Sequence, residues 1–189
     1  MALVRPQTLV SDAEQQYDGT QLRPHWIFEN FEIQGDAAVA FMGPAEVLEE
    51  HLVDLADRRD HLVIKADAML HILVEVFGAG LDQAVLMQRI LVLLAREILE
   101  EHDVPDLARR GDDFYAGEGK ISVSIATVSA VSALIHFGIN ITNEGTPVRT
   151  AALSDFGIDA SEFAAALLDR FANEVEAMAK ASTKVRPVT

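Results

Sequence analysis

Cysteine is absent from this 189-residue chain. Its absence excludes disulfides, a thiolate nucleophile, iron–sulfur clusters and zinc held by cysteine. Basic residues are also scarce, because 15 Lys and Arg stand against 30 Asp and Glu and give a net charge of −15. This charge argues against a broad surface for nucleic acid or an anionic membrane, although a small basic pocket could still hold a phosphate.

No targeting or membrane-spanning segment is apparent. The first 17 residues have no apolar stretch followed by a small-residue cleavage site, so they do not resemble a signal peptide. Residues 121–143 carry no charged side chain, but serines, threonines, His136 and Asn140 interrupt them and their apolar residues alternate as in a strand. We therefore expect a cytoplasmic protein that does not enter the membrane.

The composition is that of a folded domain. Half of the residues are hydrophobic and 24 % are charged, and a chain of this length hides roughly 70 % of its unfolded surface without needing metals or disulfides. No repeat, low-complexity tract or linker divides the sequence. We expect one domain over residues 1–189.

Hydrophobic periodicity and turn residues predict the order of the secondary structure. Residues 70–77 alternate as in a strand buried on both faces, although a helix beginning near Asp67 would also fit. The other expected elements are a short helix from Pro24 to Asn30, a strand over 37–42 closed by Gly43-Pro44, a helical pattern over 45–60, a long helix over 81–101, a hairpin of 114–116 with 120–127, a strand over 130–142, and a helix from Ala160 or Ser161 to about Ala181. This order predicts an α+β fold, a mostly antiparallel mixed sheet with helices packed on it.

The segment from Lys120 to Thr127 carries the most chemistry. In a strand, alternation places Lys120, Ser122 and Ser124 on one face. The following strand places His136 and Asn140 together in the same way. If the two strands pair, we expect one apolar face and one polar face that gathers all five residues.

Such a polar face is typical of a pocket floor. Small side chains let a ligand approach the backbone, hydroxyl and amide groups orient it, and Lys120 could neutralise a carboxylate or a polarised oxygen. The alternative is an ordinary solvated sheet face whose Ser and Thr residues suit a strand.

Three further residues are candidates for binding. Arg109 and Arg110 form the only pair of adjacent basic residues near the expected pocket. Arg110 could complement phosphates there, or it could only cap the region after the long helix. Arg23 and His25 lie in a polar loop, where they could bind a ligand or only form a structural network. The six histidines show no metal-ligand spacing, so we expect no metal site.

Two segments resemble those of known ligases. Residues 112–126 resemble the Asn-Asp, strand, turn and Lys-(Val/Ile)-Ser motif of lipoate–protein ligases, and residues 134–141 resemble their following strand and that of biotin–protein ligases. The whole chain resembles a small prokaryotic domain-of-unknown-function family, on motifs at 17–22, 111–113, 120–127 and 184–188. That family is similar in fold to these ligases and to the class II aminoacyl-tRNA synthetase catalytic domain.

The resemblance implies roles for particular residues. Lys120 takes the position of the catalytic lysine that contacts the carboxyl and phosphate of an acyl-adenylate, with ATP and magnesium as the implied cofactors. Asp112 and Asp113 take the position of the Asn-Asp pair near the phosphates, with Asp112 in place of Asn. Residues 54–60 contain no glycine where the ligases carry a Gly-rich loop that cradles phosphates.

Two functions follow as alternatives. The chain could bind or activate a small carboxylate or acyl ligand, with or without ATP, as a ligase or acyltransferase would. It could instead be a non-catalytic ligand-binding or dimeric module that kept the fold without adenylation. Related folds dimerise through sheet edges, so the resemblance also implies a homodimer.

Overall fold

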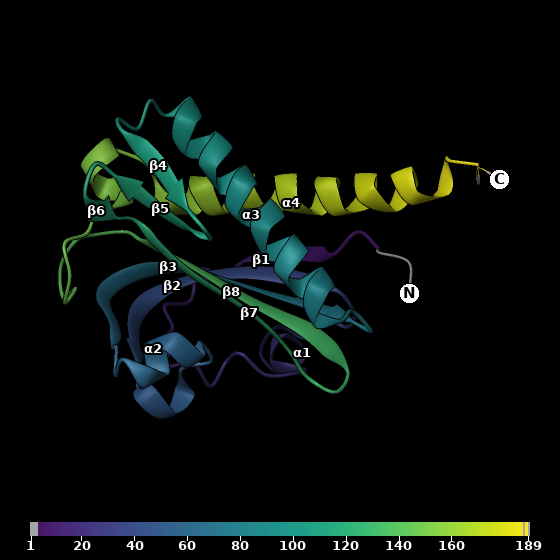
Figure 1. The fold of residues 1–189 in the computed structure, drawn as a ribbon, viewed down its shortest axis with the longest axis horizontal. Coiled ribbons are helices and arrows are strands. Elements are labelled where there is room, and N and C mark those ends of the chain that lie inside the picture. Colours follow the sequence, from purple (N-terminus) through teal and green to yellow (C-terminus); the bar gives the residue numbers. More distant parts are fainter. Residues whose placement is uncertain (1–3, 187, 189) are drawn as a thin grey trace.

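A five-stranded sheet forms the centre of the computed structural model, which describes residues 4–186 and 188 (Figure 1). Residues 1–3, in the segment examined for a signal peptide, and Pro187, in the motif at 184–188, lie outside the described residues. The elements are β1 (Gln7–Val10), α1 (Trp26–Phe31), β2 (Ala37–Val47), η1 (Glu49–His51), α2 (Leu55–Arg59), β3 (Ile64–Phe77), α3 (Leu81–Glu101), β4 (Leu107–Arg110), β5 (Asp113–Ala116), β6 (Gly119–Lys120), β7 (Ser122–Val128), β8 (Ser132–Asn140), η2 (Leu153–Phe156) and α4 (Ala160–Thr183).

The strand order in the main sheet is β1-β2-β3-β8-β7. Only β1 and β2 run parallel, and the other neighbours are antiparallel. A second sheet of β4, β5 and β6 lies beside one end of the main sheet. The predicted α+β class with a mostly antiparallel sheet is therefore confirmed.

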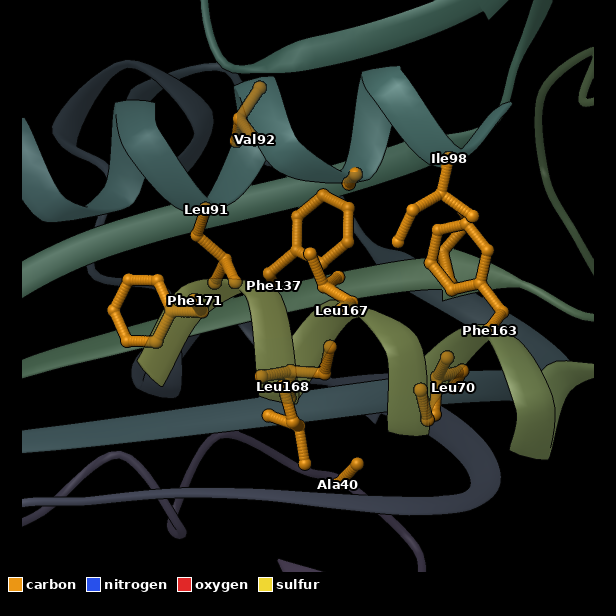
Figure 2. Packing of buried hydrophobic residues seen from close by; sticks show 14 of the residues in the cluster. Ala40, Leu70, Leu91, Val92, Ile98, Phe137, Phe163, Leu167, Leu168 and Phe171 are labelled. Atoms are coloured by element: carbon orange, nitrogen blue, oxygen red, sulfur yellow. The ribbon is translucent and has the colours of Figure 1, made fainter. Parts of the chain in front are cut away.

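Helices α3 and α4 cover one face of the main sheet, and α1 and α2 lie on the other (Figure 1). Figure 2 shows how side chains of α3 and α4 meet those of the strands, with Leu91 and Phe171 from the helices close to Phe137 from β8. Alternation explains this layer, because every second residue of β3 from Leu70 to Val76 faces the helices. We call this side the helix face.

The other side carries a smaller core and several polar residues. Trp26, Phe41 and Leu73 pack there with neighbouring apolar side chains. Buried Glu75 accepts hydrogen bonds from Ser132 Oγ at 2.7 Å and from the backbone N–H of His25 at 3.0 Å. These bonds satisfy the carboxylate and fasten the start of α1 to the sheet. We call this side the cavity face.

Several predicted elements are confirmed. Residues 70–77 form a strand and not a helix, α3 spans the predicted residues, and Asp159 caps α4 by accepting the N–H groups of Ser161 and Glu162. The hairpin forms between β5 and β6, but the chain then leaves it, so that β7 pairs with β8.

The helical pattern over 45–60 is wrong. β2 continues to Val47, because a bulge between Gly43 and Ala45 accommodates Pro44 without ending the strand. Only η1 and the five-residue α2 are helical in this region. Among the described helices, none is long and apolar enough to span a membrane.

Candidate ligand-binding site

The polar residues of β7 and β8 lie on opposite faces of the sheet. Ser122 pairs with Ile139, and residues directly opposite one another in an antiparallel pair point to the same face. Ser122 and Ser124 therefore point to the helix face, whereas His136 and Asn140 point to the cavity face. The single polar face predicted from the sequence is wrong, because the pairing register joins each serine to an apolar position of β8.

The two serine hydroxyls satisfy buried donors. Ser122 Oγ accepts the backbone N–H of Phe114 at 3.0 Å. Gln88 of α3 donates its Nε2 to Ser124 Oγ and to Asp112 Oδ2, both at 2.8 Å. The hydrogen bonds of the two hydroxyl groups thus connect β7 to α3 and to the small sheet. Ser124 and Ser122 also contribute to the lining of the two cavities described below.

Lys120 ends β6 and forms an ion pair with Asp113, with Nζ 2.7 Å from Oδ2. Burial lowers the pKa of Lys120. The charge and the hydrogen bond of Asp113 raise this pKa, with help from other nearby groups, by more than burial lowers it, so the pKa lies above its ordinary value. Burial raises the pKa of Asp113, Lys120 lowers it, and the charges of Asp112 and Asp57 add to the increase. The ammonium of Lys120 is therefore charged at neutral pH.

Asp112 is neutralised from the helix face. Its Oδ1 lies 3.2 Å from the guanidinium of Arg89, in addition to the bond from Gln88. Arg89 of α3 therefore pairs with Asp112. Both carboxylate oxygens of Asp112 therefore already have partners within the protein.

Asn140 positions the backbone beside Lys120. The residue is 4 % exposed, and its Nδ2 donates to the carbonyl oxygens of Lys120 at 3.0 Å and of Ala151 at 3.2 Å. The amide thereby joins β8 to the end of β6 and to the segment before η2. Asn140 is a positioning residue that also lines the cavity beside Lys120.

A cavity of about 190 Å³ opens on the cavity face beside Lys120. Its polar lining includes Lys120, Lys65 and Asn140. Its apolar lining includes Met69 and Val123, together with residues of the 62–64 and 147–148 segments. We call it the lysine cavity. It combines an ammonium group with an extended apolar wall.

A smaller cavity of about 50 Å³ adjoins it, since Asp57 and Ile64 line both. Buried Tyr17 and His136 line this second space, with their rings stacked and the ring centroids 3.8 Å apart. Asp54 lines it as well. We call it the histidine cavity.

Arg110, Arg23 and His25 lie outside both cavities. The Arg110 guanidinium stacks over the ring of Tyr115 at 4.5 Å. Arg23 pairs with Glu29 at 2.5 Å, and His25 uses its backbone N–H to bind buried Glu75. The fold brings Lys120 and Asn140 to the lysine cavity and His136 to the adjoining histidine cavity, and leaves Arg110, Arg23 and His25 apart from them.

Helix α2 lies where the resemblance calls for a phosphate cradle. The carboxylate of Asp54 already accepts the backbone N–H groups of Ala56 at 2.7 Å and Asp57 at 3.1 Å. Asp57 and Asp60 add negative charge, and residues 54–60 contain no glycine. Residues 54–60 therefore do not fit the phosphates of a nucleoside triphosphate as a Gly-rich loop would. Within the described part of the chain, no three His, Asp or Glu side chains are grouped so that they could hold a metal ion.

The arrangement of strands and helices is the biotin/lipoate–protein ligase fold. A T. acidophilum protein provisionally assigned as a lipoate protein ligase, with bound lipoic acid, matches with a TM-score of 0.58 at 16 % identity, over 91 % of this chain and 86 % of that one. An Aquifex aeolicus biotin protein ligase variant in complex with biotin matches with a TM-score of 0.61 at 14 % identity, over 94 % of this chain and 73 % of that one. These likenesses show the fold alone.

The chain belongs to the family described as "Domain of unknown function (DUF366)", whose profile matches residues 7–186. The uncharacterised protein MJ0805 of Methanocaldococcus jannaschii is 35 % identical over 179 residues, which cover 91 % of this chain and 80 % of that protein. The solved structure of a protein of unknown function from Pyrococcus horikoshi matches with a TM-score of 0.92 at 38 % identity, over 97 % of this chain and 99 % of that one. The family resemblance predicted from the sequence is confirmed.

Sequence reasoning missed some residues of the cavities. Asp57 belongs to the segment expected to be helical and Lys65 to the stretch that follows it, and their spacing carried no signal of a shared cavity. Tyr17 was noted within a motif, but its stacking on His136 depends on the isolated bridge between Tyr17 and Ala45 beside β2. No pattern along the chain could have joined Tyr17 to His136.

Proposed function

We propose that this protein binds a small amphipathic carboxylic acid in the lysine cavity. The carboxylate lies beside the ammonium of Lys120, and the hydrocarbon part packs against Met69 and Val123. The observation that carries the proposal is a charged lysine, held at the edge of a cavity that is otherwise walled largely by apolar side chains.

The chemistry of this cavity suits such a ligand. An ammonium forms a charge-assisted hydrogen bond with a carboxylate, and pockets that bind small molecules combine apolar walls with a few polar groups. In a chain with a net charge of −15, Lys120 and Lys65 supply positive charge to the lining of this cavity, and Asp57 supplies a carboxylate. The named ligands of the two ligase-fold neighbours, lipoic acid and biotin, both join a carboxylate to a hydrocarbon chain.

The proposal covers binding without adenylation. Two N–H groups in the first turn of helix α2 are already accepted by the side chain of Asp54 and are not offered to a phosphate. The acidic residues near Lys120 would repel the phosphates of a nucleotide. The chain thereby supports the non-catalytic alternative over the ligase alternative.

Isothermal titration calorimetry, which measures the affinity for octanoate and for lipoate, tests the proposal. Lys120→Met should weaken binding about tenfold or more, because the carboxylate loses its ion pair. Lys180→Met is the matched control, since Lys180 is an exposed α4 lysine that pairs with Glu176. Equal affinity of Lys120→Met and the unaltered protein would refute the site.

A second assay separates binding from activation. We expect no ATP–pyrophosphate exchange with octanoate, lipoate, biotin or amino acids. Exchange that requires Lys120 would overturn the non-adenylating part of the proposal and establish the ligase alternative. Cytoplasmic location and a homodimer stay predictions, and light scattering coupled to size-exclusion chromatography tests the dimer.

A further inference from the structure

A chain of hydrogen bonds orders the two buried histidines. His71 Nε2 lies 3.3 Å from the carbonyl oxygen of Gly43, and His71 Nδ1 lies 3.1 Å from His136 Nε2. A carbonyl only accepts, so Nε2 of His71 carries the proton and its Nδ1 accepts. His136 then donates through Nε2, and its Nδ1 keeps a free lone pair.

Both rings are neutral, which preserves this order. Burial lowers the pKa of His71 to about 4, with a smaller opposing effect from the Gly43 carbonyl. Burial also lowers the pKa of His136 well below its ordinary value, and the neighbouring His71 adds to that effect. His136 is 3 % exposed and lines the histidine cavity, and its Nδ1 has no hydrogen-bond partner among the described residues. An acceptor that belongs to a buried residue, and that has no hydrogen-bond partner among the described residues, therefore borders this cavity.

Two carboxylates and His51, whose Nδ1 lies 3.0 Å from the carbonyl oxygen of Asp18, join His136 in the lining of the histidine cavity. Asp54 and Asp57 line it, and none of its described lining residues is Lys or Arg. Burial and the charge of Asp54 raise the pKa of Asp57, whereas Lys120 lowers it. A cation placed here would stabilise the carboxylate of Asp57 and could donate to His136 Nδ1.

We propose that the histidine cavity binds a primary ammonium group, so that the ligand is an ω-amino carboxylic acid spanning both cavities. This inference rests on the proposed function, because Lys120 holds the carboxylate end. Asp57 lines both cavities and lies along the path between them. Lys65 and Lys120 line the lysine cavity alone, Asp54 lines the histidine cavity alone, and Asp57 is shared, so that the positive charge lies at one end and the excess of negative charge at the other, as the two ends of a zwitterion require.

The length of the ligand follows from β8. His136 borders one cavity and Asn140 the other, four residues along the same strand. At about 3.3 Å per residue, their Cα atoms are about 13 Å apart. The ligand is therefore a medium-length chain, and the optimum is found with a ladder of ω-amino acids from 4-aminobutyrate to 8-aminooctanoate.

The test compares each ω-amino acid with the alkanoate of equal length by isothermal titration. We expect the optimal ω-amino acid to bind about tenfold tighter than its alkanoate. Asp57→Asn should reduce this ratio to about one while alkanoate binding persists. Asp60→Asn is the matched control, because Asp60 caps the other end of α2 and lines neither cavity, and it should leave the ratio unchanged.

The outcomes separate this inference from the proposed function. If alkanoates bind through Lys120 but no ω-amino acid binds more tightly, the ammonium site is refuted and the carboxylate site stands. If neither series binds, the proposed function fails. Hexylamine gives an independent measurement, since its binding should survive Lys120→Met and weaken in Asp57→Asn. Hexylamine binding that is indifferent to Asp57 would overturn the ammonium site.

Discussion

Asp113→Asn should strengthen the binding of octanoate about tenfold. Lys120 already has a carboxylate partner in Asp113, with Nζ and Oδ2 2.7 Å apart. A ligand carboxylate must therefore share or replace this partner. The asparagine keeps the shape of the side chain and removes its charge, which leaves the ammonium for the ligand.

The magnitude follows from the exposure of the pair. Two unit charges about 4 Å apart attract by about 1 kcal/mol in water and by about 4 kcal/mol at an effective dielectric constant of 20. The side chains of Lys120 and Asp113 are 31 % and 20 % exposed, so the value lies toward the lower end of this range. A gain of about 1.4 kcal/mol corresponds to tenfold in affinity.

The substitution should cost little stability. The pKa of Asp113 is raised in the folded protein by burial, and by Asp112 and Asp57 against the effect of Lys120. An acid whose folded pKa is raised favours folding most in its protonated form, and this contribution is lost as the pH rises through that pKa. Asparagine resembles the protonated form, so we expect the free energy of unfolding to change by less than about 1 kcal/mol.

Titration calorimetry with octanoate at low and moderate salt measures the effect. The gain should shrink as salt screens the charges. Asp169→Asn is the control, because Asp169 is an exposed residue of α4 remote from Lys120. Unchanged or weaker binding by Asp113→Asn, with the fold intact, would refute the argument that Asp113 competes with the ligand.

Three other substitutions test the structure around the cavities. Because the pKa of His71 falls from 6.5 to about 4 on folding, stability should fall as the pH drops from about 6.5 toward 4, by up to roughly 3 kcal/mol. Urea unfolding at pH 7 and pH 5 should show a weaker pH dependence in His71→Phe, and an equal dependence would contradict the assignment. Asn140→Ala should lose about 1–3 kcal/mol of stability and weaken octanoate binding, because the backbone of Lys120 loses a donor; unchanged unfolding would show that this bond contributes nothing. Gly43→Ala should lose at least about 2 kcal/mol of stability, since its Cβ would clash with the carbonyl oxygen of Gln15. If the variant unfolded at the same urea concentration as the unaltered protein, this close approach would be refuted.

Elements with strong local signals could be predicted from the sequence. The periodicity of α3, the capping Asp159 of α4 and the alternation of β3 depend on residues close together in the chain. The segment over 45–60 failed for the opposite reason. Its apolar spacing suits a helix, but tertiary pairing with β3 keeps 45–47 in β2.

The candidate site divides in the same way. Lys120 could be identified because a lone lysine beside small polar residues is a local pattern, and it does line a cavity. Its pairing with Asp113 and the support from Asn140 involve residues 7 and 20 positions away along the chain, respectively, in other strands. Which neighbour a side chain meets depends on how the strands are placed, which no single segment encodes.

The absence of cysteine and the scarcity of basic residues excluded thiolate chemistry and a broad polyanion surface, and those conclusions needed only the sequence. The sequence by itself also determined the α+β class and the alternation within β7 and β8. Only the tertiary structure decided that the serines of β7 face the helices while His136 and Asn140 face the cavities. The physical reason is that a strand sets its own period of two, whereas a shift of one residue between paired strands exchanges which faces join.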